Sequence, residues 1–184
     1  MKKIIVIGSS GAGKTHFSSE LSERLGIELV HIDKIYWQPG WTEPSKDEWK
    51  AKLAEILKGD AWIIDGNYTA TVEMRLAACD TAIFLDIRRT LCMWRVIRRT
   101  FRFFRRSRPD MADGCREWLD FQFLLFVWNY PKVTRPRIMT MLKAAEPTTR
   151  IIYLRSPREV KQFLKGLKRE PVSPQVYPLT ARAE

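Results

Sequence analysis

The stretch GSSGAGKT, from Gly8 to Thr15, decides the fold of this 184-residue chain. It fits the pattern G-x-x-x-x-G-K-[ST] without a mismatch. An apolar, β-branched run (KIIVI, 3–7) precedes it, and a segment with apolar residues at helical spacing (14–25) follows it. A strand, a glycine-rich loop and a helix in this order are the context in which the pattern forms a phosphate-binding loop. We therefore predict a nucleotide-binding P-loop.

The residue types of this loop suit phosphate chemistry. Three glycines let the backbone turn so that N–H groups point at phosphate oxygens, and the helix N-terminus adds partial positive charge. We expect Lys14 to reach the β- and γ-phosphates and the Thr15 hydroxyl to bind Mg²⁺. The predicted phosphate-binding residues are Gly8, Ser9, Ser10, Gly11, Ala12, Gly13, Lys14 and Thr15.

Outward from the loop, short apolar runs alternate with helical patterns. We expect five strands, at 3–7, 28–32, 61–65, 81–87 and 150–154. We expect helices at 14–25, 46–58, 71–78, 89–106, 114–129, 136–145 and 157–167, with a loop at 34–45 and breaks at Pro131 and Pro136. This alternation predicts an α/β fold with a five-stranded parallel sheet and helices on both faces. One domain at 1–168 and a loosely ordered, proline-bearing tail at 169–184 are expected.

The charge of the chain is concentrated in one place. The net charge is +11, and nine arginines lie in RRTLCMWRVIRRTFRFFRRSR, residues 88–108, which has no acidic residue. The 23 lysines and arginines elsewhere nearly balance the 21 acidic residues. Such a local concentration indicates a site for an anion.

Several classes of protein are excluded. Cys79, Cys92 and Cys115 form no CxxC pair, and two histidines are too few for a metal centre, so we expect neither a disulfide framework nor a zinc site. The apolar run in MKKIIVIG is too short for a signal peptide. No stretch of about 20 apolar residues is present, so we expect no transmembrane helix, no membrane partner and a cytoplasmic protein.

Carboxylates follow three of the predicted strands. Ligands of parallel sheets bind at the carboxyl ends of strands, so Asp33 and Asp65 are site candidates. Asp65 resembles a Walker-B acid that holds Mg²⁺, and Asp33 would accept a proton from a substrate hydroxyl; a turn cap is the structural alternative for each. We expect Asp86 to pair with Arg88 or Arg89, and His31 to be a packed core residue.

Other residues allow two readings at this point. The aromatic group at 36–41 either covers the core or walls a substrate pocket, to which Asn67 and Tyr68 would contribute polar contacts. Arg75 is either a phosphate ligand or part of a solvated helix face. FQFLLFVW, residues 121–128, is expected to pack in the core.

The arginine stretch has helical periodicity, with most arginines on one side and apolar residues opposite. Arg95 and Arg99 lie one turn apart near its start and are the best candidates to contact transferred phosphate, followed by Arg88. Arg102, Arg105 and Arg106 lie too far along the helix to contact the same triphosphate. They would pair with acids such as Asp110, Asp113 or Glu117, or meet a partner.

Together, the P-loop, HIDKIYWQPGW, WIIDGNYTAT, FLDIRR, RPDMADGC and LRSPREV resemble the bacterial DNA topology modulation proteins (FlaR-type), in the adenylate-kinase-like branch of P-loop kinases. The resemblance implies ATP with Mg²⁺, a substrate-binding insert at about 34–60 and a helical, arginine-rich lid at about 88–130. It also implies that Ser156 and Pro157 flank adenine. DGNYT lacks the arginine that adenylate kinases carry after the third strand, which argues against AMP as the acceptor.

The sequence therefore favours an ATP-dependent kinase of a small, nucleotide- or nucleoside-like acceptor. In it, Lys14, Asp33, Arg95 and Arg99 would be catalytic, and Thr15 and Asp65 would bind the metal. The alternative is an ATP-binding regulator that contacts nucleic acid through the arginine face of 88–106. A third possibility is a P-loop protein that only hydrolyses nucleotide or binds a membrane surface.

Overall fold

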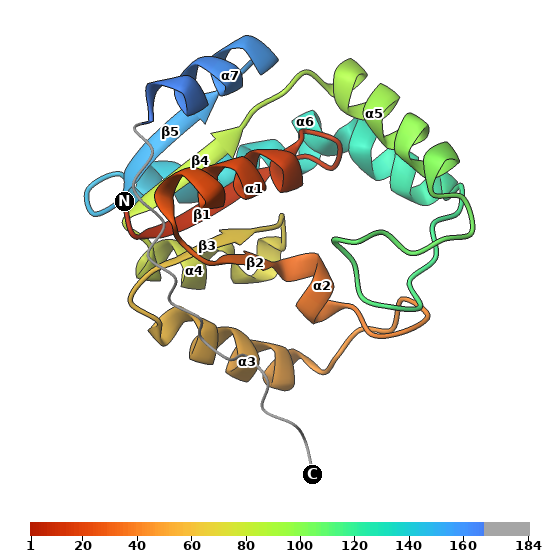
Figure 1. Cartoon of the computed structure of the whole chain (residues 1–184), viewed down its shortest axis with the longest axis horizontal. Helices are drawn as coiled ribbons and strands as arrows, with labels where there is room; N and C mark the ends of the chain where they lie inside the picture. The colour runs from red at the N-terminus through yellow and green to blue at the C-terminus, as the bar shows by residue number, and fades with distance from the viewer. Residues whose placement is uncertain (168–184) are drawn as a thin grey trace.

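Five parallel strands form the centre of the molecule in the computed structural model, which describes residues 1–167 (Figure 1). They are β1 (Lys3–Gly8), β2 (Leu29–His31), β3 (Trp62–Asp65), β4 (Thr81–Leu85) and β5 (Arg150–Leu154), and their order in the sheet is β2-β3-β1-β4-β5. Every neighbouring pair is parallel. The predicted sheet is confirmed. The tail expected at 169–184 lies outside the described residues.

Helices cover both faces of this sheet. Helices α1 (Lys14–Leu25), α5 (Arg89–Arg102) and α7 (Pro157–Gly166) pack on the face that Ile4 and Val6 of β1 present. Helices α3 (Lys46–Lys58) and α4 (Val72–Ala78) and most of α6 (Phe121–Ala145) pack on the face of Ile5 and Ile7. The central strands β1, β3 and β4 are buried on both faces, which is why they read as continuous apolar runs, whereas the edge strands β2 and β5 are half-buried.

The segment after β2 differs from the predicted loop at 34–45. A short helix, α2 (Ile32–Tyr36), begins directly after His31, and Asp33 lies in its first turn. Ile32 and Tyr36 are buried one turn apart, so core packing fixes this helix despite its length. A 3₁₀ turn, η1 (Thr69–Thr71), precedes α4 on the neighbouring connection.

The arginine-rich region is helical only in part, so the helices predicted at 89–106 and 114–129 are wrong in extent. Helix α5 ends at Arg102, and residues 103–120 form an irregular segment that we call the lid loop. Arg105 has a positive φ of 60°, its N–H donates to Glu117 O at 2.9 Å, and Glu117 N–H donates to Arg106 O at 3.0 Å. These bonds across the loop replace those that a longer helix would make.

Helix α6 is continuous where a break was predicted. It spans 25 residues with Pro131 and Pro136 inside it. One stripe of buried side chains crosses both prolines: Val127, Tyr130, Thr134, Ile138 and Leu142. Spacings of three and four residues place this stripe on one face of a helix, and its burial outweighs the hydrogen bonds that the prolines cannot donate.

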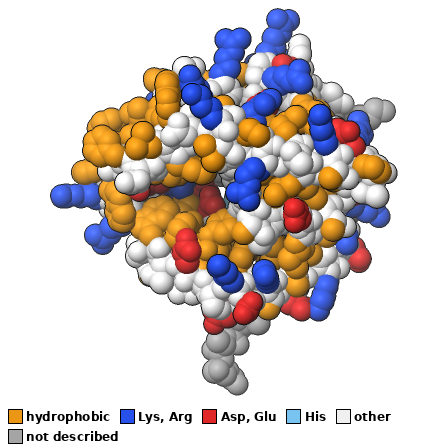
Figure 2. Space-filling model, turned by 180° about the vertical axis from the view of Figure 1, so that it is seen from behind, with side chains coloured by type: hydrophobic (Ala, Val, Ile, Leu, Met, Phe, Trp, Pro, Cys, Tyr) orange, Lys and Arg blue, Asp and Glu red, His pale blue; other side chains and the backbone are white. Residues whose placement is uncertain are grey.

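The prediction that 121–128 packs in the core is also wrong for most of its side chains. Of these residues, only Val127 is fully buried. The exposed large apolar side chains of residues 1–167, apart from Met1, are Trp94, Phe101, Phe104, Trp118, Leu119, Phe121, Leu125, Phe126, Trp128 and Val133. Seen from behind, apolar side chains gather at the edge of the molecule that α5 and α6 form (Figure 2). Within the described residues, no helix is long and apolar enough to span a bilayer.

Candidate active site

The phosphate loop turns around glycines with positive φ and opens α1. A side chain on Gly11, where φ is 79°, would overlap the Cys92 carbonyl of α5, so the phosphate loop packs directly on α5. The Lys14 ammonium donates to Gly8 O at 3.0 Å and to Ser9 O at 3.2 Å. Burial lowers the pKa of Lys14, against the opposing effect of Asp33 and Asp65. The loop residues predicted to bind phosphate are thus assembled at the carboxyl end of β1.

Arg95 contacts this loop rather than standing over it. Its Nη1 donates to Ala12 O at 3.0 Å and to Gly11 O at 3.4 Å. A guanidinium that binds two loop carbonyls fixes the loop against α5. Arg95 therefore supports the phosphate loop from its outer side, beside Gly13, and it also lines a cavity there. Its contact with transferred phosphate stays a prediction.

Asp33 lies on the inner side of the loop, near Lys14. Burial raises the pKa of Asp33, while the nearby ammonium of Lys14 acts in the opposite direction. A carboxylate with a raised pKa is a stronger proton acceptor than one in water. The residue that the sequence predicts as the base is therefore close to Lys14, the lysine predicted to bind phosphate.

His31 contacts Asp65 rather than packing in the core, which corrects its predicted role. His31 Nδ1 and Asp65 Oδ1 are 2.9 Å apart at the ends of β2 and β3. The hydrogen bond to Asp65 raises the pKa of His31, although burial opposes this. Asp65 Oδ2 is buried and has no hydrogen-bond partner among the residues described.

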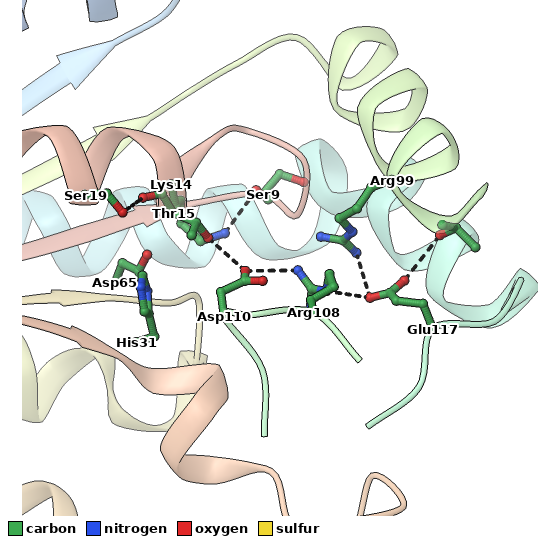
Figure 3. Close-up of polar contacts among 11 residues, drawn as sticks. Ser9, Lys14, Thr15, Ser19, His31, Asp65, Arg99, Arg108, Asp110 and Glu117 are labelled. Carbon is green, nitrogen blue, oxygen red and sulfur yellow. Dashed lines mark hydrogen bonds and ion pairs between the residues drawn. The ribbon is translucent and has the colours of Figure 1, made fainter. Parts of the chain in front are cut away.

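A chain of polar contacts joins the phosphate loop to the lid loop (Figure 3). Thr15 Oγ1 donates to Asp110 Oδ2 at 3.1 Å, and Arg108 Nη1 donates to the same oxygen at 3.1 Å. Arg108 Nε lies 2.7 Å from Glu117 Oε1, close enough for an ion pair although the N–H is not aligned for a hydrogen bond. Arg99 Nη2 lies 3.8 Å from that oxygen. Burial, followed by the charge of Arg108, lowers the pKa of Arg99.

The sequence reading missed Arg108 as a site residue, and it gave Asp110 and Glu117 the wrong partners. These acids pair with Arg108 and Arg99, whereas Arg102, Arg105 and Arg106 are exposed. The available signal was the RPD triplet within a lid, where a proline separates a cation from an acid. Arg108 is only 9% exposed, which no periodicity could indicate because the lid loop has none.

The donor set beside the loop fits Mg²⁺. Hard cations take oxygen ligands, and Thr15 contributes a hydroxyl, Asp110 a carboxylate in contact with it, and Asp65 a buried carboxylate oxygen without a partner. No group of three or more His, Cys, Asp or Glu side chains that would hold a metal alone occurs within residues 1–167.

Two cavities meet at Arg99. The outer cavity, about 740 Å³, lies among α1, α5 and α7 and includes Gly13, Arg95 and Pro157. The inner cavity, about 680 Å³, lies among the phosphate loop, α2, residues 67–70, the lid loop and the start of α6. Lys14 and Asp33 line the inner cavity, and Arg99 lines both. Helix α5 thus carries a cation where the two cavities meet.

Aromatic side chains wall the inner cavity, and both readings of the 36–41 group hold. Tyr36 is buried against Tyr68, with ring centroids 3.9 Å apart, and so covers the core. Trp37, Trp41 and Trp118 line the cavity, and the last two meet with centroids 6.2 Å apart. The Trp41 indole N–H also donates to Arg116 O at 3.0 Å.

Arg75 is neither a phosphate ligand nor a solvated residue. Its side chain is fully buried and donates to three backbone carbonyls, those of Gly66 at 3.0 Å, Tyr68 at 2.9 Å and Thr71 at 3.3 Å. Burial lowers its pKa to about 10. Arg75 therefore fixes the loop whose residues 67–70 line the inner cavity.

The remaining predicted residues lie at the margins. Arg88 is exposed at the start of α5 and lines neither cavity. Asp86 pairs with Arg135 of α6, at 2.8 and 2.7 Å, and not with Arg88 or Arg89 as predicted. Ser156 caps α7 by accepting from Glu159 N–H, and Pro157 lines the outer cavity beside it.

Comparison with known proteins gives the fold. No protein-family model matches the chain. The uncharacterized protein YqaC of Bacillus subtilis (strain 168) is 26% identical over 117 residues, or 62% of this chain, and the match spans 65% of that protein's length. Shikimate kinase from Acinetobacter baumannii, in complex with shikimate, has a TM-score of 0.57 and 15% identity, covering 90% of this chain and 89% of that one.

Two further structures are similar. A sugar kinase from a Janibacter species has a TM-score of 0.51 and 19% identity, covering 90% of this chain and 93% of that one. Deoxyadenosine kinase from M. mycoides with bound dATP has a TM-score of 0.51 and 14% identity, covering 89% and 98%. At these identities the likeness shows the fold, which is the fold of P-loop kinases.

Proposed function

We propose that this chain is a kinase that transfers the γ-phosphoryl group of ATP to a small-molecule acceptor. The observation that carries the proposal is the pair of cavities that meet at Arg99, with Lys14 and Asp33 at the edge of the inner one. A kinase needs one space for each substrate and cations where they meet. A protein that only hydrolyses nucleotide needs no second cavity of this size.

In this proposal ATP lies against the phosphate loop and extends into the outer cavity, towards Ser156 and Pro157, and the acceptor occupies the inner cavity. The bond between the γ-phosphorus and the β-bridging oxygen breaks while one forms to the acceptor hydroxyl oxygen. Asp33 takes the hydroxyl proton, and Lys14 and Arg99 neutralise charge on the transferred group. Arg95 holds the phosphate loop in place. Arg88 is exposed and lines neither cavity, so we assign it no step in this proposal.

Mg²⁺, when bound, neutralises phosphate oxygens and so supplies electrostatic stabilisation of the transferred group. Thr15 and Asp65 would hold it, with Asp110 as a further acid that the sequence reading left out. The Asp110 carboxylate contacts Thr15 directly and Arg108 in turn, so the lid loop orients it.

We further propose a nucleotide- or nucleoside-like acceptor. The inner cavity has planar aromatic walls, including Trp37, Trp41 and Trp118, which suit stacking on a base. The cationic side chains that line this cavity suit a phosphate group of the acceptor, or the phosphoryl group that the acceptor hydroxyl receives. We also propose membership of the FlaR-type topology modulation proteins, a single domain at 1–168 with insert 34–60 and lid 88–130, and a cytoplasmic location.

Acceptor-dependent ADP release tests the proposal. The full chain with ATP and Mg²⁺ is assayed against nucleotides, nucleosides and sugars, and we expect one class to raise ADP release well above basal hydrolysis. Lys14→Ala and Asp33→Asn should each abolish that increase, by about 10²-fold or more. Lys58→Ala and Asp60→Asn, at exposed positions of α3 and the turn after it, serve as matched controls. An enzyme that no acceptor stimulates would refute the proposal.

A further inference from the structure

An unusual concentration of exposed apolar side chains lies on one edge of the molecule. Three of these side chains also border the cavities described above: Trp94 lines the outer cavity, and Trp118 and Phe126 line the inner one. Apart from Met1, every exposed large apolar residue within 1–167 falls between Trp94 and Val133. Single exposed apolar residues are ordinary, but contiguous groups mark surfaces that contact something. We call this edge the α5–α6 surface; it consists of the exposed side chains of α5, the lid loop and the first half of α6.

Helix α6 contributes an apolar stripe to this surface. Phe121, Leu125 and Trp128 are 71%, 56% and 42% exposed, and steps of four and three residues place them on one side of the helix. The exposed Lys132 continues the stripe one turn further. The opposite side of the helix carries its buried residues. Helix α6 thus has two apolar sides: one packs in the core, and the other is exposed.

Helix α5, which packs beside α6, adds aromatic residues interleaved with arginines (Figure 1). Trp94 and Phe101 are 55% and 70% exposed. The Arg98 guanidinium lies 5.0 Å from the centre of the Trp94 ring, and that of Arg89 lies 4.3 Å from the centre of the Trp128 ring. The arginines that contact no acid are therefore spread among the apolar residues.

We propose that the α5–α6 surface docks onto an anionic lipid bilayer. Aromatic and aliphatic side chains would enter the boundary between headgroups and acyl chains, and the arginines would contact headgroup phosphates. This mixture of exposed apolar residues and cations on a helical face is typical of interfacial binding, in which apolar burial and electrostatic attraction add. Attachment of this kind needs no membrane-spanning helix, and it departs from the sequence-based expectation that the protein has no membrane partner.

The charges of the surface argue against a second copy of this chain as the occupant. Between residues 89 and 133 the exposed acidic residue is Asp113, whereas the exposed cations are Arg98, Arg102, Arg105, Arg106, Arg116 and Lys132. A two-fold dimer would bring the same surfaces together and place cations against cations. An anionic bilayer supplies the missing negative charge.

The aliphatic residues argue against nucleic acid. Contact with a phosphate backbone requires cations, and base stacking uses aromatic rings. Leu119, Leu125 and Val133 have neither property, and covering them with phosphates would bury polar groups without partners. Acyl chains have no such cost.

Co-sedimentation of the full chain with lipid vesicles tests this proposal, and it needs neither ATP nor an acceptor. We expect binding to vesicles of phosphatidylcholine and phosphatidylserine at about two to one, and at least tenfold weaker binding to phosphatidylcholine alone. Phe121→Ser with Leu125→Ser should weaken binding at least tenfold. Arg105→Gln with Arg106→Gln should weaken it by about fivefold for each charge and reduce its salt dependence. Lys46→Gln with Lys50→Gln on α3 removes the same charge elsewhere and should change nothing.

Several outcomes would overturn the proposal. The proposal fails if the wild type does not bind vesicles, or if both surface variants bind them as well as the wild type does. Two other results would also overturn it if the wild type does not bind vesicles. One is a concentration-dependent dimer, seen by light scattering, that the surface variants abolish. The other is salt-sensitive binding to a DNA duplex that the same variants abolish. Should the apolar variant fail to fold, brominated lipids provide a second measurement. They should quench part of the wild-type tryptophan fluorescence, and Trp128→Phe should reduce the quenched fraction.

Discussion

At the scale of residues, the site depends on charged side chains that the fold shields from water. Burial lowers the pKa of Lys14 and raises that of Asp33, so each is shifted towards its neutral form. A bound phosphate would oppose the first shift by favouring the ammonium. Asp33 would then face a more strongly charged lysine. If nucleotide binds as proposed, electrostatics alone would couple the charges of Lys14 and Asp33 to its binding.

The His31–Asp65 pair should make stability depend on pH. The hydrogen bond to Asp65 raises the pKa of His31 above 6.5 in the folded protein. The protonated pair is therefore stabilising below the unfolded pKa, and the contribution is lost as pH rises through the folded pKa. We expect His31→Gln to lower the free energy of unfolding at both pH values, but by roughly 1 kcal/mol more at about pH 5.5 than at about pH 8.5.

Urea unfolding at the two pH values measures this difference. The control is His16→Gln, which changes the second histidine, at an exposed position of α1. Its difference from wild type should be small and should not follow the same course with pH. A His31→Gln difference that is constant with pH, or that grows as pH rises, would show that the pair does not act through its charge.

At the scale of elements, the sequence predicts well where its signals are local. The P-loop and the five strands depend on glycine spacing and apolar runs, and they appear where expected. Helix α6 shows a different case, because Pro131 and Pro136 are strong local signals for a break. The buried stripe from Val127 to Leu142 outweighs them, and a stripe is recognised only when the helix is assumed to continue.

The lid loop could not be predicted for another reason. Across the loop, Arg105 N–H donates to Glu117 O and Glu117 N–H donates to Arg106 O, and the buried Arg108 pairs with Asp110 and Glu117. These contacts join residues without any periodic relation in sequence. The arginine periodicity alone therefore extended the predicted helix to residue 106, whereas α5 ends at Arg102.

Removing one proline from α6 should stabilise the protein. Pro136 is exposed, so Pro136→Ala restores a backbone donor to the helix and loses little packing. The gain in helix propensity, reduced by the greater freedom of the unfolded chain, amounts to about 1–2 kcal/mol. A higher urea midpoint at unchanged m-value would confirm it. Pro109→Ala in the lid loop should lower the midpoint slightly, and a loss of stability in Pro136→Ala would mean that α6 requires the proline.

At the scale of the whole molecule, the insert after β2 and the lid loop after α5 close over the inner cavity together. Gly40 N–H donates to Gly114 O at 3.4 Å, and the Cys115 thiol donates to Gln38 O at 3.2 Å. Trp41 and Trp118 also meet along this line of contact, which we call the seam between the insert and the lid loop. Closure over the inner cavity, the proposed acceptor site, is thus set by contacts between two segments about 75 residues apart in sequence, as the Trp41–Arg116 bond illustrates.

Opening this seam should weaken acceptor binding more than ATP binding. Trp118 is 56% exposed and lines the inner cavity but not the outer one, so Trp118→Ala removes a wall and the Trp41 contact without emptying the core. In the acceptor-dependent assay we expect the acceptor KM to rise about tenfold, or about 1.4 kcal/mol, with the ATP KM within about twofold of wild type. Phe101→Ala, at a 70% exposed position that lines neither cavity, is the matched control. Equal increases in both KM values would show that the lid acts on the two substrates as one unit, and an unchanged acceptor KM would place the acceptor outside the inner cavity.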